Sequence, residues 1–432
     1  MSVSRVHGGG PFTADLELPG DKSITHRAFL IGSLSGKTVR VIGALDSADT
    51  RSTLGALEAL GSGVIRRNGG AIDIVPAAWC SPAAPIDCGN SGTTARLLAG
   101  LLAATPISAI LTGDASLRRR PMRRIIDPLS AMGARIGAEA GTLPIEILGG
   151  GLRTGTRHEL AVASAQVKSA ILLAATRAGV AVSIHEPGPA RDHTERMLSV
   201  AGRPVTRLPG GWLELEEGPR ELSMPNELNI PGDISSAAFL FVAAAITGGR
   251  ARVQGLGVNP TRTGVLDLLG RAGARVVIEP EDDRAGEAVA TVTVEGGELR
   301  GFEVSGGEVV RAIDELPAIA VLAAAARGRS VVADAAELRV KESDRIRGIC
   351  SGLAKLGARV EERPDGFVVE GGGRLAGGSV DAEGDHRLAM AFAVAGLAAR
   401  GTTDVIGAEC VDVSFPGFWG ILRTGIAPGS AP

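Results

Sequence analysis

The sequence predicts an α/β fold in two lobes, each an inside-out α/β barrel of three pseudo-symmetric units with buried helices and outer sheets. Two repeated features predict it: a Leu-x-x-x-Gly signature that recurs six times, and a set of helical segments that are apolar on every face. The 432 residues suit two or three domains, and the apolar share of 44% is ample for large cores.

The repeated signature marks helix ends. Each copy is followed by an alternating, strand-like run, and a glycine is favoured where a helix ends in left-handed geometry. Successive glycines lie 72, 69, 71, 84 and 68 residues apart, which predicts three units per lobe. The copies are Leu57–Gly61, Leu129–Gly133, Leu198–Gly202, Leu269–Gly273, Leu353–Gly357 and the weaker Ile421–Gly425.

The apolar helical segments predict the inside of each lobe. Helices that are apolar all round are buried rather than laid on a surface. A first helix is expected after the turn at Pro19-Gly20. The Ala- and Leu-rich segments that follow are Thr94–Ala104, Val167–Ala178, Ser235–Ile246, Leu316–Ala326 and His386–Ala399.

A linker between the lobes is expected where the repeat pattern is missing. Met224–Gly232 is bracketed by two prolines and resembles the stretch Leu16–Gly20 in composition. The prediction is a first lobe over residues 20–227 and a second over 1–19 plus 232–432, with crossings near 14–20 and 225–232.

Composition excludes several classes of function. A net charge of −3, 3% aromatic residues and no Tyr argue against nucleic acid or membrane partners. The four Cys form no CxxC pair and the six His no HExxH, so neither a metal site nor a disulfide framework is expected. No signal peptide and no apolar run of about 18 residues is seen, which predicts a cytoplasmic protein.

Positive charge gathers at predicted helix starts in the first half. Free N–H groups there favour anions, and Arg offers a fork to carboxylate or phosphate. Caps, tight turns and solvated charge explain the same residues, and for the last segment a cap with an ion pair is favoured. The segments are Lys22–Arg27, Cys88–Arg96, Arg118–Arg124, Ala163–Ser169 and Arg191–Glu195.

Three mixed-charge clusters lie in the second half: Ile313–Pro317, Val340–Arg345 and Gly384–Arg387. Ion pairs and caps account for each equally well. Catalysis on anions, however, needs this mixture of arginines, a lysine and carboxylates that exchange protons.

Seven segments in order resemble the EPSP synthase family, the 3-phosphoshikimate 1-carboxyvinyltransferases of the shikimate pathway. The matching segments are Pro19–Arg27, Gly89–Thr93, Arg120-Pro121, Ser164–Gln166, Ile313–Glu315, Arg339–Arg345 and Asp385–Arg387. The resemblance implies the two-lobed fold predicted above. It also implies transfer of the enolpyruvyl group of phosphoenolpyruvate to the 5-hydroxyl of shikimate 3-phosphate, by addition and elimination with lobe closure.

The same resemblance implies roles for individual residues, with Asp314 as base, Glu342 as acid and Lys22 touching both substrates. The residues assigned to shikimate 3-phosphate are Lys22, Ser23, Arg27, Ser164, Ala165, Gln166, Arg191, Asp314 and Lys341. Those assigned to phosphoenolpyruvate are Lys22, Asn90, Gly92, Arg120, Gln166, Glu342, Arg345 and Arg387. No cofactor or metal is implied, and a monomer is expected.

The chain departs from the family pattern at a few positions. Val413 stands where many relatives carry a Lys, Leu97 where many carry Pro, and without Tyr a ring contact falls to Arg191. Gly92 leaves room for glyphosate at the phosphoenolpyruvate site, whereas the altered neighbours argue for weaker binding.

Two other functions are weighed against this one. A UDP-N-acetylglucosamine enolpyruvyl transferase would carry a Cys in the segment Arg118–Arg124, which has none. A non-catalytic phosphosugar-binding protein would need neither Asp314 nor Glu342.

Overall fold

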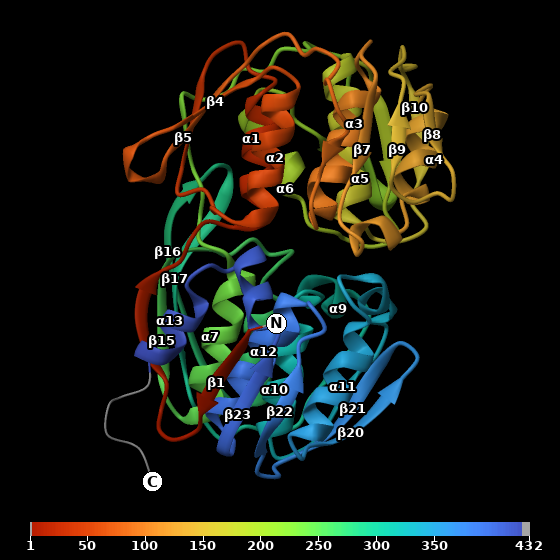
Figure 1. Ribbon diagram of the computed structural model, residues 1–432. Coiled ribbons are helices and arrows are strands. Elements are labelled where there is room, and N and C mark those ends of the chain that lie inside the picture. The colour runs from red at the N-terminus through yellow and green to blue at the C-terminus, as the bar shows by residue number, and fades with distance from the viewer. Residues whose placement is uncertain (1, 426–432) are drawn as a thin grey trace. The chain divides into compact units, whose positions relative to one another are not determined.

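The computed structural model describes residues 2–425 and confirms the α/β fold class (Figure 1). The chain divides into two compact units. The first unit is Pro19–Pro231 together with the short segment Asp283–Glu287. The second unit holds the described residues of Met1–Leu18, Gly232–Asp282 and Ala288–Pro432.

The first unit contains six helices and three four-stranded sheets among its described residues. The helices are α1 (Lys22–Gly32), α2 (Ala48–Ala59), α3 (Gly92–Ala103), α4 (Arg123–Ala131), α5 (Ala165–Ala178) and α6 (His193–Val200). The strands are β3 (Val39–Ile42), β4 (Gly63–Arg66), β5 (Ile72–Val75), β6 (Ile86–Asp87), β7 (Ala109–Thr112), β8 (Ile136–Ala138), β9 (Ile145–Ile147), β10 (Thr156–Glu159), β11 (Val182–His185), β12 (Thr206–Arg207), β13 (Trp212–Leu215) and β14 (Glu227–Asn229). The sheet orders are β14-β3-β5-β4, β6-β7-β9-β8 and β10-β11-β13-β12.

The second unit has a similar plan within its described residues, with seven helices, two four-stranded sheets and one three-stranded sheet. Its helices are α7 (Ile234–Thr247), α8 (Gly264–Ala272), α9 (Gly307–Ala312), α10 (Leu316–Ala325), α11 (Arg345–Lys355), α12 (His386–Leu397) and α13 (Phe418–Thr424). Its strands are β1 (Val3–His7), β2 (Thr13–Glu17), β15 (Arg250–Gly257), β16 (Arg275–Arg284), β17 (Glu287–Glu295), β18 (Glu303–Val304), β19 (Gly328–Val332), β20 (Arg359–Arg363), β21 (Gly366–Gly371), β22 (Ala376–Asp381) and β23 (Arg400–Ile406). The sheet orders are β16-β17-β15-β2, β18-β19-β21-β20 and β1-β23-β22.

Strand pairing shows the repeat directly. In each sheet of the first unit one edge strand pairs parallel and the other three strands pair antiparallel, as where β6 pairs parallel with β7 while β9 pairs antiparallel with both β7 and β8. The sheet of β18, β19, β21 and β20 in the second unit has the same pattern. The six expected repeat units therefore correspond to six sheets.

The Leu-x-x-x-Gly signature is a Schellman helix ending in five of its six copies. Gly61, Gly133, Gly202, Gly273 and Gly357 have φ of +100°, +110°, +78°, +106° and +86°. In each copy the N–H of the residue after the glycine donates to the carbonyl of the signature leucine, over 2.8 to 3.0 Å. The leucine side chains are buried, so one short motif both ends the helix and anchors it in the core.

The sixth copy behaves differently from the expectation. Gly425 ends α13 with φ −74°, in ordinary right-handed geometry. A Cβ at this position would collide with the ring of Phe12. Close packing, and not left-handed backbone, explains the glycine there.

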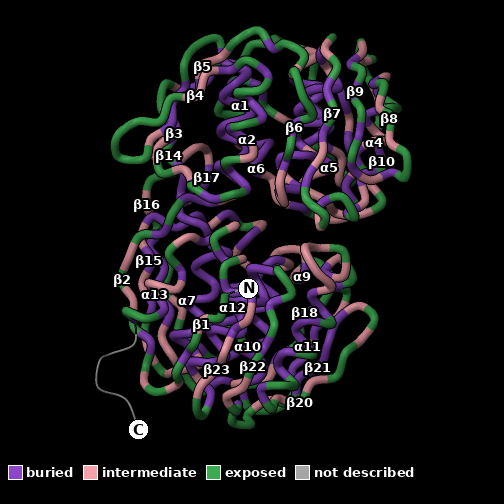
Figure 2. Tube along the Cα trace, viewed as in Figure 1, coloured by how far each residue is buried: buried purple, intermediate pink, exposed green. Residues whose placement is uncertain are grey.

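The apolar helices form the cores, as predicted. Helices α3, α5, α7, α10 and α12 begin and end within two residues of the expected bounds. All twelve residues of α12 are buried, and Figure 2 shows α7, α10 and α12 buried along their length. Helices α3 and α5 cross so closely that a Cβ on Gly100 would collide with the backbone of Ala170. Among residues 2–425, no helix combines the length and the apolar character needed to cross a bilayer.

Candidate active site

Three inner helices of the first unit begin at the predicted anion-binding segments. Lys22, Gly92 and Ala165 are the first residues of α1, α3 and α5. The preceding residues cap these helices: Asp21 accepts from the Ile24 N–H at 2.9 Å, Ser91 from Thr94 at 3.1 Å and Ser164 from Val167 at 3.5 Å. The cap interpretation is therefore confirmed, and it leaves the other N–H groups of each first turn to a ligand.

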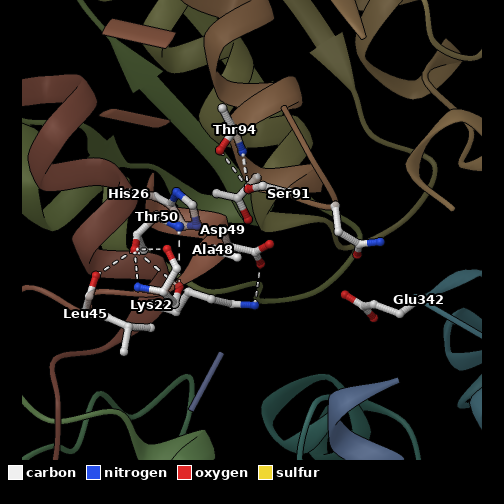
Figure 3. Close-up of polar contacts among 12 residues, drawn as sticks. Lys22, His26, Leu45, Ala48, Asp49, Thr50, Ser91, Thr94 and Glu342 are labelled. Atoms are coloured by element: carbon white, nitrogen blue, oxygen red, sulfur yellow. Dashed lines mark hydrogen bonds and ion pairs between the residues drawn. The ribbon is translucent and has the colours of Figure 1, made fainter. Parts of the chain in front are cut away.

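Lys22 is held in place by a carboxylate that sequence reasoning missed. Its Nζ lies 2.9 Å from Oδ2 of Asp49, and both side chains are mostly buried (Figure 3). Asp49 lies in the first turn of α2, which Ser47 and Thr50 start with a capping box. Nothing in the local pattern distinguishes this aspartate from an ordinary first-turn acid, so only the fold reveals its partner.

Arg27 is buried among hydroxyl groups. Its Nε donates to Thr194 Oγ1 at 2.7 Å and its Nη2 to Ser169 Oγ at 2.8 Å, which ties α1 to α6 and α5. Burial lowers the pKa of Arg27 to about 10, against the opposing effect of nearby carboxylates including Glu195, so the guanidinium stays charged at neutral pH. Ser23 and Arg191, the other two predicted residues nearby, are half-buried.

The arginine-rich segment Arg118–Arg124 contains one buried member. Arg120 is 7% exposed, whereas the other four arginines lie in solvent. Its Nη2 donates to Asn90 Oδ1 at 2.6 Å, and Asn90 Nδ2 donates to Asp114 Oδ2 at 2.7 Å. The solvated interpretation is thus confirmed for four arginines, while Arg120 belongs to the cluster at the start of α3.

Gln166 links the starts of α3 and α5. Its Oε1 accepts from Arg96 Nη1 at 2.6 Å and its Nε2 donates to Thr93 Oγ1 at 3.0 Å. A Cβ built on Gly92 would lie 2.8 Å from Arg96 Nη1 and 3.3 Å from Arg120 Nη1. Two guanidinium groups therefore flank this glycine, and Arg96 joins the cluster although it was not among the predicted site residues.

The segment Arg191–Glu195 is held by ion pairs. Glu195 Oε1 lies 2.6 Å from Nζ of the buried Lys168, and Asp192 Oδ1 lies 2.9 Å from Arg196 Nε. The ion-pair interpretation is confirmed. The side-chain cap is wrong, because Asp192 makes no capping hydrogen bond at the start of α6.

The second unit gathers the other predicted residues around Asp314. Its Oδ1 lies 3.3 Å from Lys341 Nζ and 3.5 Å from Arg345 Nη1. Arg387 donates through Nη1 to the Asp314 carbonyl at 2.9 Å and brings its Nη2 within 4.0 Å of Oδ2. Three cationic side chains from different segments thus surround one carboxylate.

Arg345 is the most buried charge of this cluster, with its side chain 1% exposed. It binds Asp385 through Nε at 2.8 Å and Nη2 at 3.2 Å, and its Nη2 lies 2.6 Å from Glu342 Oε2. Burial opposes its charge, but Asp385, Glu342 and Asp314 outweigh that effect and raise the pKa of Arg345. Asp385, which also caps α12, holds this arginine and was not among the predicted site residues.

A buried histidine gives the first unit a pH-dependent stability. Burial first, and then the positive charges of Lys22 and Arg27, lower the pKa of His26 well below 6.5, while Asp21 acts weakly in the other direction. The folded state therefore binds fewer protons than the unfolded state below pH 6.5, and stability falls there as the pH falls.

We expect the variant His26→Gln to lose this dependence. Relative to the variant, the wild type should lose up to about 1.4 kcal/mol of unfolding free energy for each pH unit below 6.5. Urea unfolding of both proteins between pH 5 and pH 7.5 measures the difference. A constant difference over that range would contradict a neutral buried His26.

The described residues hold no group of three His, Cys, Asp or Glu arranged to bind a metal ion. The chemistry of both clusters is that of cations, carboxylates, hydroxyls and amides.

Comparison with known proteins assigns the family. The family model for EPSP synthase (3-phosphoshikimate 1-carboxyvinyltransferase) matches residues 6–422. The chain is 48% identical to the 3-phosphoshikimate 1-carboxyvinyltransferase of Anaeromyxobacter sp. over 425 residues, 98% of each chain. It is 47% identical to that of Halorhodospira halophila over 97% of this chain and 95% of the relative. The solved EPSP synthase of Acinetobacter baumannii superposes with a TM-score of 0.86 at 40% identity, over 98% of both chains. The chain therefore belongs to the EPSP synthase family.

Proposed function

We propose that this protein transfers the enolpyruvyl group of phosphoenolpyruvate to the 5-hydroxyl of shikimate 3-phosphate and releases phosphate. The relatives that match nearly the whole chain are named for this transferase. The observation that carries the proposal is that both carboxylates, Asp314 and Glu342, are present within one cluster of cations.

The reaction proceeds in two balanced steps. In the addition, the 5-hydroxyl oxygen bonds to C2 of phosphoenolpyruvate, its proton goes to a base, and C3 gains a proton from an acid. In the elimination, the bond from C2 to the phosphate oxygen breaks, phosphate leaves, and C3 returns a proton to restore the double bond. Positioned acids and bases typically contribute 10²- to 10⁴-fold to such steps.

We assign binding of the anions to the helix starts of the first unit. Ser164, Ala165 and Gln166 at the start of α5 suit the phosphate and ring of shikimate 3-phosphate, together with Ser23 and Arg27. First-turn N–H groups and buried guanidinium groups are suitable donors for such ligands.

Phosphoenolpyruvate is assigned to the cluster at the start of α3. Gly92 allows close backbone approach there, Asn90 holds Arg120 through its side-chain amide, and Arg120 and Lys22 provide charge. Arg345 and Arg387 of the second unit complete this set in the proposal.

The second unit supplies the proton transfers in this assignment. Asp314 removes the 5-hydroxyl proton, Glu342 protonates C3, and Lys341 contacts shikimate 3-phosphate. Arg345 and Lys341 both contact Oδ1 of the Asp314 carboxylate, which fixes the position that a base requires.

The direct test is to mix the protein with both substrates and follow inorganic phosphate. Phosphate release that requires shikimate 3-phosphate supports the proposal. Release with UDP-N-acetylglucosamine in its place would favour the related enolpyruvyl transferase. Tight binding of both substrates without any release would favour a non-catalytic binding protein.

The variant Gly92→Ala should weaken phosphoenolpyruvate binding selectively. The added methyl would press on Arg96 and Arg120, whose flexible ends can move, so the fold survives while the anion donors shift. We expect KM for phosphoenolpyruvate to rise about tenfold or more, a loss of the size of one charged hydrogen bond. KM for shikimate 3-phosphate should change little.

Gly55→Ala is the matched control, because Gly55 lies in α2 of the same unit and a Cβ there would meet no atom within 4 Å. Initial-rate kinetics of both variants measure the effect. Equal KM values for phosphoenolpyruvate in the two variants would contradict the assignment of Gly92.

Glyphosate, a phosphonate and carboxylate anion, is proposed to occupy the phosphoenolpyruvate site. The absence of a side chain at Gly92, between two guanidinium groups, supports this placement. Competition against phosphoenolpyruvate in the phosphate assay tests it.

We also propose that the enzyme acts as a monomer in the cytoplasm, which sedimentation and cell fractionation would check.

A further inference from the structure

A buried line of four side chains runs through the first unit and includes no residue assigned above to a substrate. His26 Nδ1 lies 2.7 Å from Thr53 Oγ1, Thr53 Oγ1 lies 2.7 Å from Thr94 Oγ1, and Thr94 Oγ1 lies 2.7 Å from Ser91 Oγ. The four residues come from α1, α2 and the start of α3, and none is more than 1% exposed. Figure 3 shows His26, Thr94 and Ser91 on these elements.

The direction of this line follows from counting protons, since each hydroxyl has one to donate. Thr94 donates its hydroxyl proton to Ser91 Oγ, and the Thr94 N–H donates to the same oxygen at 3.1 Å. Thr94 Oγ1 must then accept from Thr53. Thr53 Oγ1 in turn must accept from His26, which requires the proton on Nδ1.

The histidine end of the line is therefore a single neutral tautomer. Nδ1 carries the proton, and Nε2 is buried with no hydrogen-bond partner in the described part of the chain. The low pKa of His26 agrees with a neutral ring. A neutral ring with a fixed tautomer gives the hydroxyl chain one orientation.

At the serine end of the line, the Ser91 hydroxyl proton makes no hydrogen bond to the other three residues. Both acceptor positions of Ser91 Oγ are taken by Thr94, so the Ser91 hydroxyl proton is directed away from the line. Ser91 lies between Asn90 and Gly92, and the Asn90 amide is already bound to Arg120 and Asp114. At the start of α3, Ser91 thus offers a hydroxyl donor whose orientation is fixed from behind.

We propose that Ser91 donates its hydroxyl proton to phosphoenolpyruvate, and that Thr94, Thr53 and His26 are positioning residues that fix this donor. The inference rests on the proposed function and adds a binding residue to its site. A preoriented donor raises affinity for an anion because less freedom is lost on binding.

The first test is the variant Ser91→Gly, because glycine is nearly as good a helix cap as serine while it lacks the hydroxyl. We expect KM for phosphoenolpyruvate to rise about tenfold or more, as for loss of a hydrogen bond to a charged ligand. The turnover number and KM for shikimate 3-phosphate should stay within about threefold, and Ser91→Thr, which keeps a hydroxyl, should restore the affinity. An unchanged KM for phosphoenolpyruvate in Ser91→Gly would overturn the proposal.

The second test breaks the line behind the serine. Thr94→Val should raise KM for phosphoenolpyruvate and Thr94→Ser should restore it. The control Thr176→Val removes an equally buried hydroxyl, bonded to the Leu172 carbonyl at 2.8 Å near the end of α5, and should leave KM unchanged. If Thr94→Val and Thr176→Val changed KM for phosphoenolpyruvate equally, Thr94 would have only a structural role, and the proposal that it positions Ser91 would be wrong.

The third test needs no substrate. Nitrogen-15 spectra of the ligand-free protein report which ring nitrogen of His26 carries the proton. Protonated Nδ1 supports the direction of the line, and protonated Nε2 refutes it. If the wild type released no phosphate, the proposed function would fail, but this spectrum would still test the direction of the hydrogen bonds from His26 to Ser91. If the wild type turns over normally and the Ser91 variants have an unchanged KM for phosphoenolpyruvate, only the inference fails.

Discussion

Asp314→Asn should lower the turnover number by about a thousandfold, within the range known for loss of a positioned base. Asparagine keeps the shape of the aspartate and one acceptor oxygen for Lys341 and Arg345, but it cannot take the 5-hydroxyl proton. Because the start of α5 is untouched, shikimate 3-phosphate should still bind. Phosphate release and calorimetric titration with shikimate 3-phosphate measure the two effects separately.

Glu342→Gln should give a loss of similar size, since glutamine cannot protonate C3. The control is Glu361→Gln, a surface carboxylate of β20 in the same unit that is 65% exposed and forms an ion pair with Arg363. It should keep full turnover. If Asp314→Asn and Glu342→Gln both kept a turnover number near that of the control, the assignment of base and acid would be wrong.

The repeating fold could be predicted because its signals are local. A Schellman ending is written in the five residues Leu-x-x-x-Gly, and helices such as α10 and α12 are apolar over their whole length. Such features do not depend on which other segment is nearby. Gly425 shows the limit of this reasoning, since there the glycine serves the packing of Phe12 instead of a left-handed turn.

The partners of the charged site residues could not be predicted, because they come from distant parts of the chain. Asp49 lies 27 residues from Lys22, and Asp385 lies 40 residues from Arg345. Nor does the charge pattern of Arg118–Arg124 say which of its five arginines turns inward, and only the family resemblance pointed to Arg120. The structure selects Arg120, because Asn90 at the start of α3 accepts its hydrogen bond.

One interaction of the first unit was also beyond local reasoning. Segment Asp283–Glu287 contains the end of β16, the turn after it and the first residue of β17, and it packs as part of the first unit. Glu287 Oε1 lies 2.7 Å from Nδ1 of His193 on α6, across 94 residues of sequence, and both side chains are buried. The expected lobe boundaries rested on the missing repeat pattern, the two prolines and the composition of the linker, and none of these carries a signal for this segment.

Arg345→Met should strongly destabilise the second unit. Methionine fills much of the same space, but it leaves the carboxylates of Asp385, Glu342 and Asp314 facing one another in a buried cluster with one cation fewer. Removing one partner of a buried ion pair typically costs about 3–5 kcal/mol, because the remaining charge is left uncompensated. The unfolding free energy from urea titration measures the cost. Arg363→Met, a half-exposed arginine of the same unit, should cost less than about 0.5 kcal/mol.

A second substitution separates lost charge compensation from lost packing. Asparagine caps a helix as well as aspartate does, so Asp385→Asn keeps the start of α12 while it removes the charge that Arg345 binds. In the double variant Arg345→Met with Asp385→Asn, we expect at least about 1.5 kcal/mol of the loss to be recovered, a coupling within the range for directly bonded residues. Additive losses would show instead that Arg345 stabilises the unit through its packing, and that Asp385 does not hold it in position through charge.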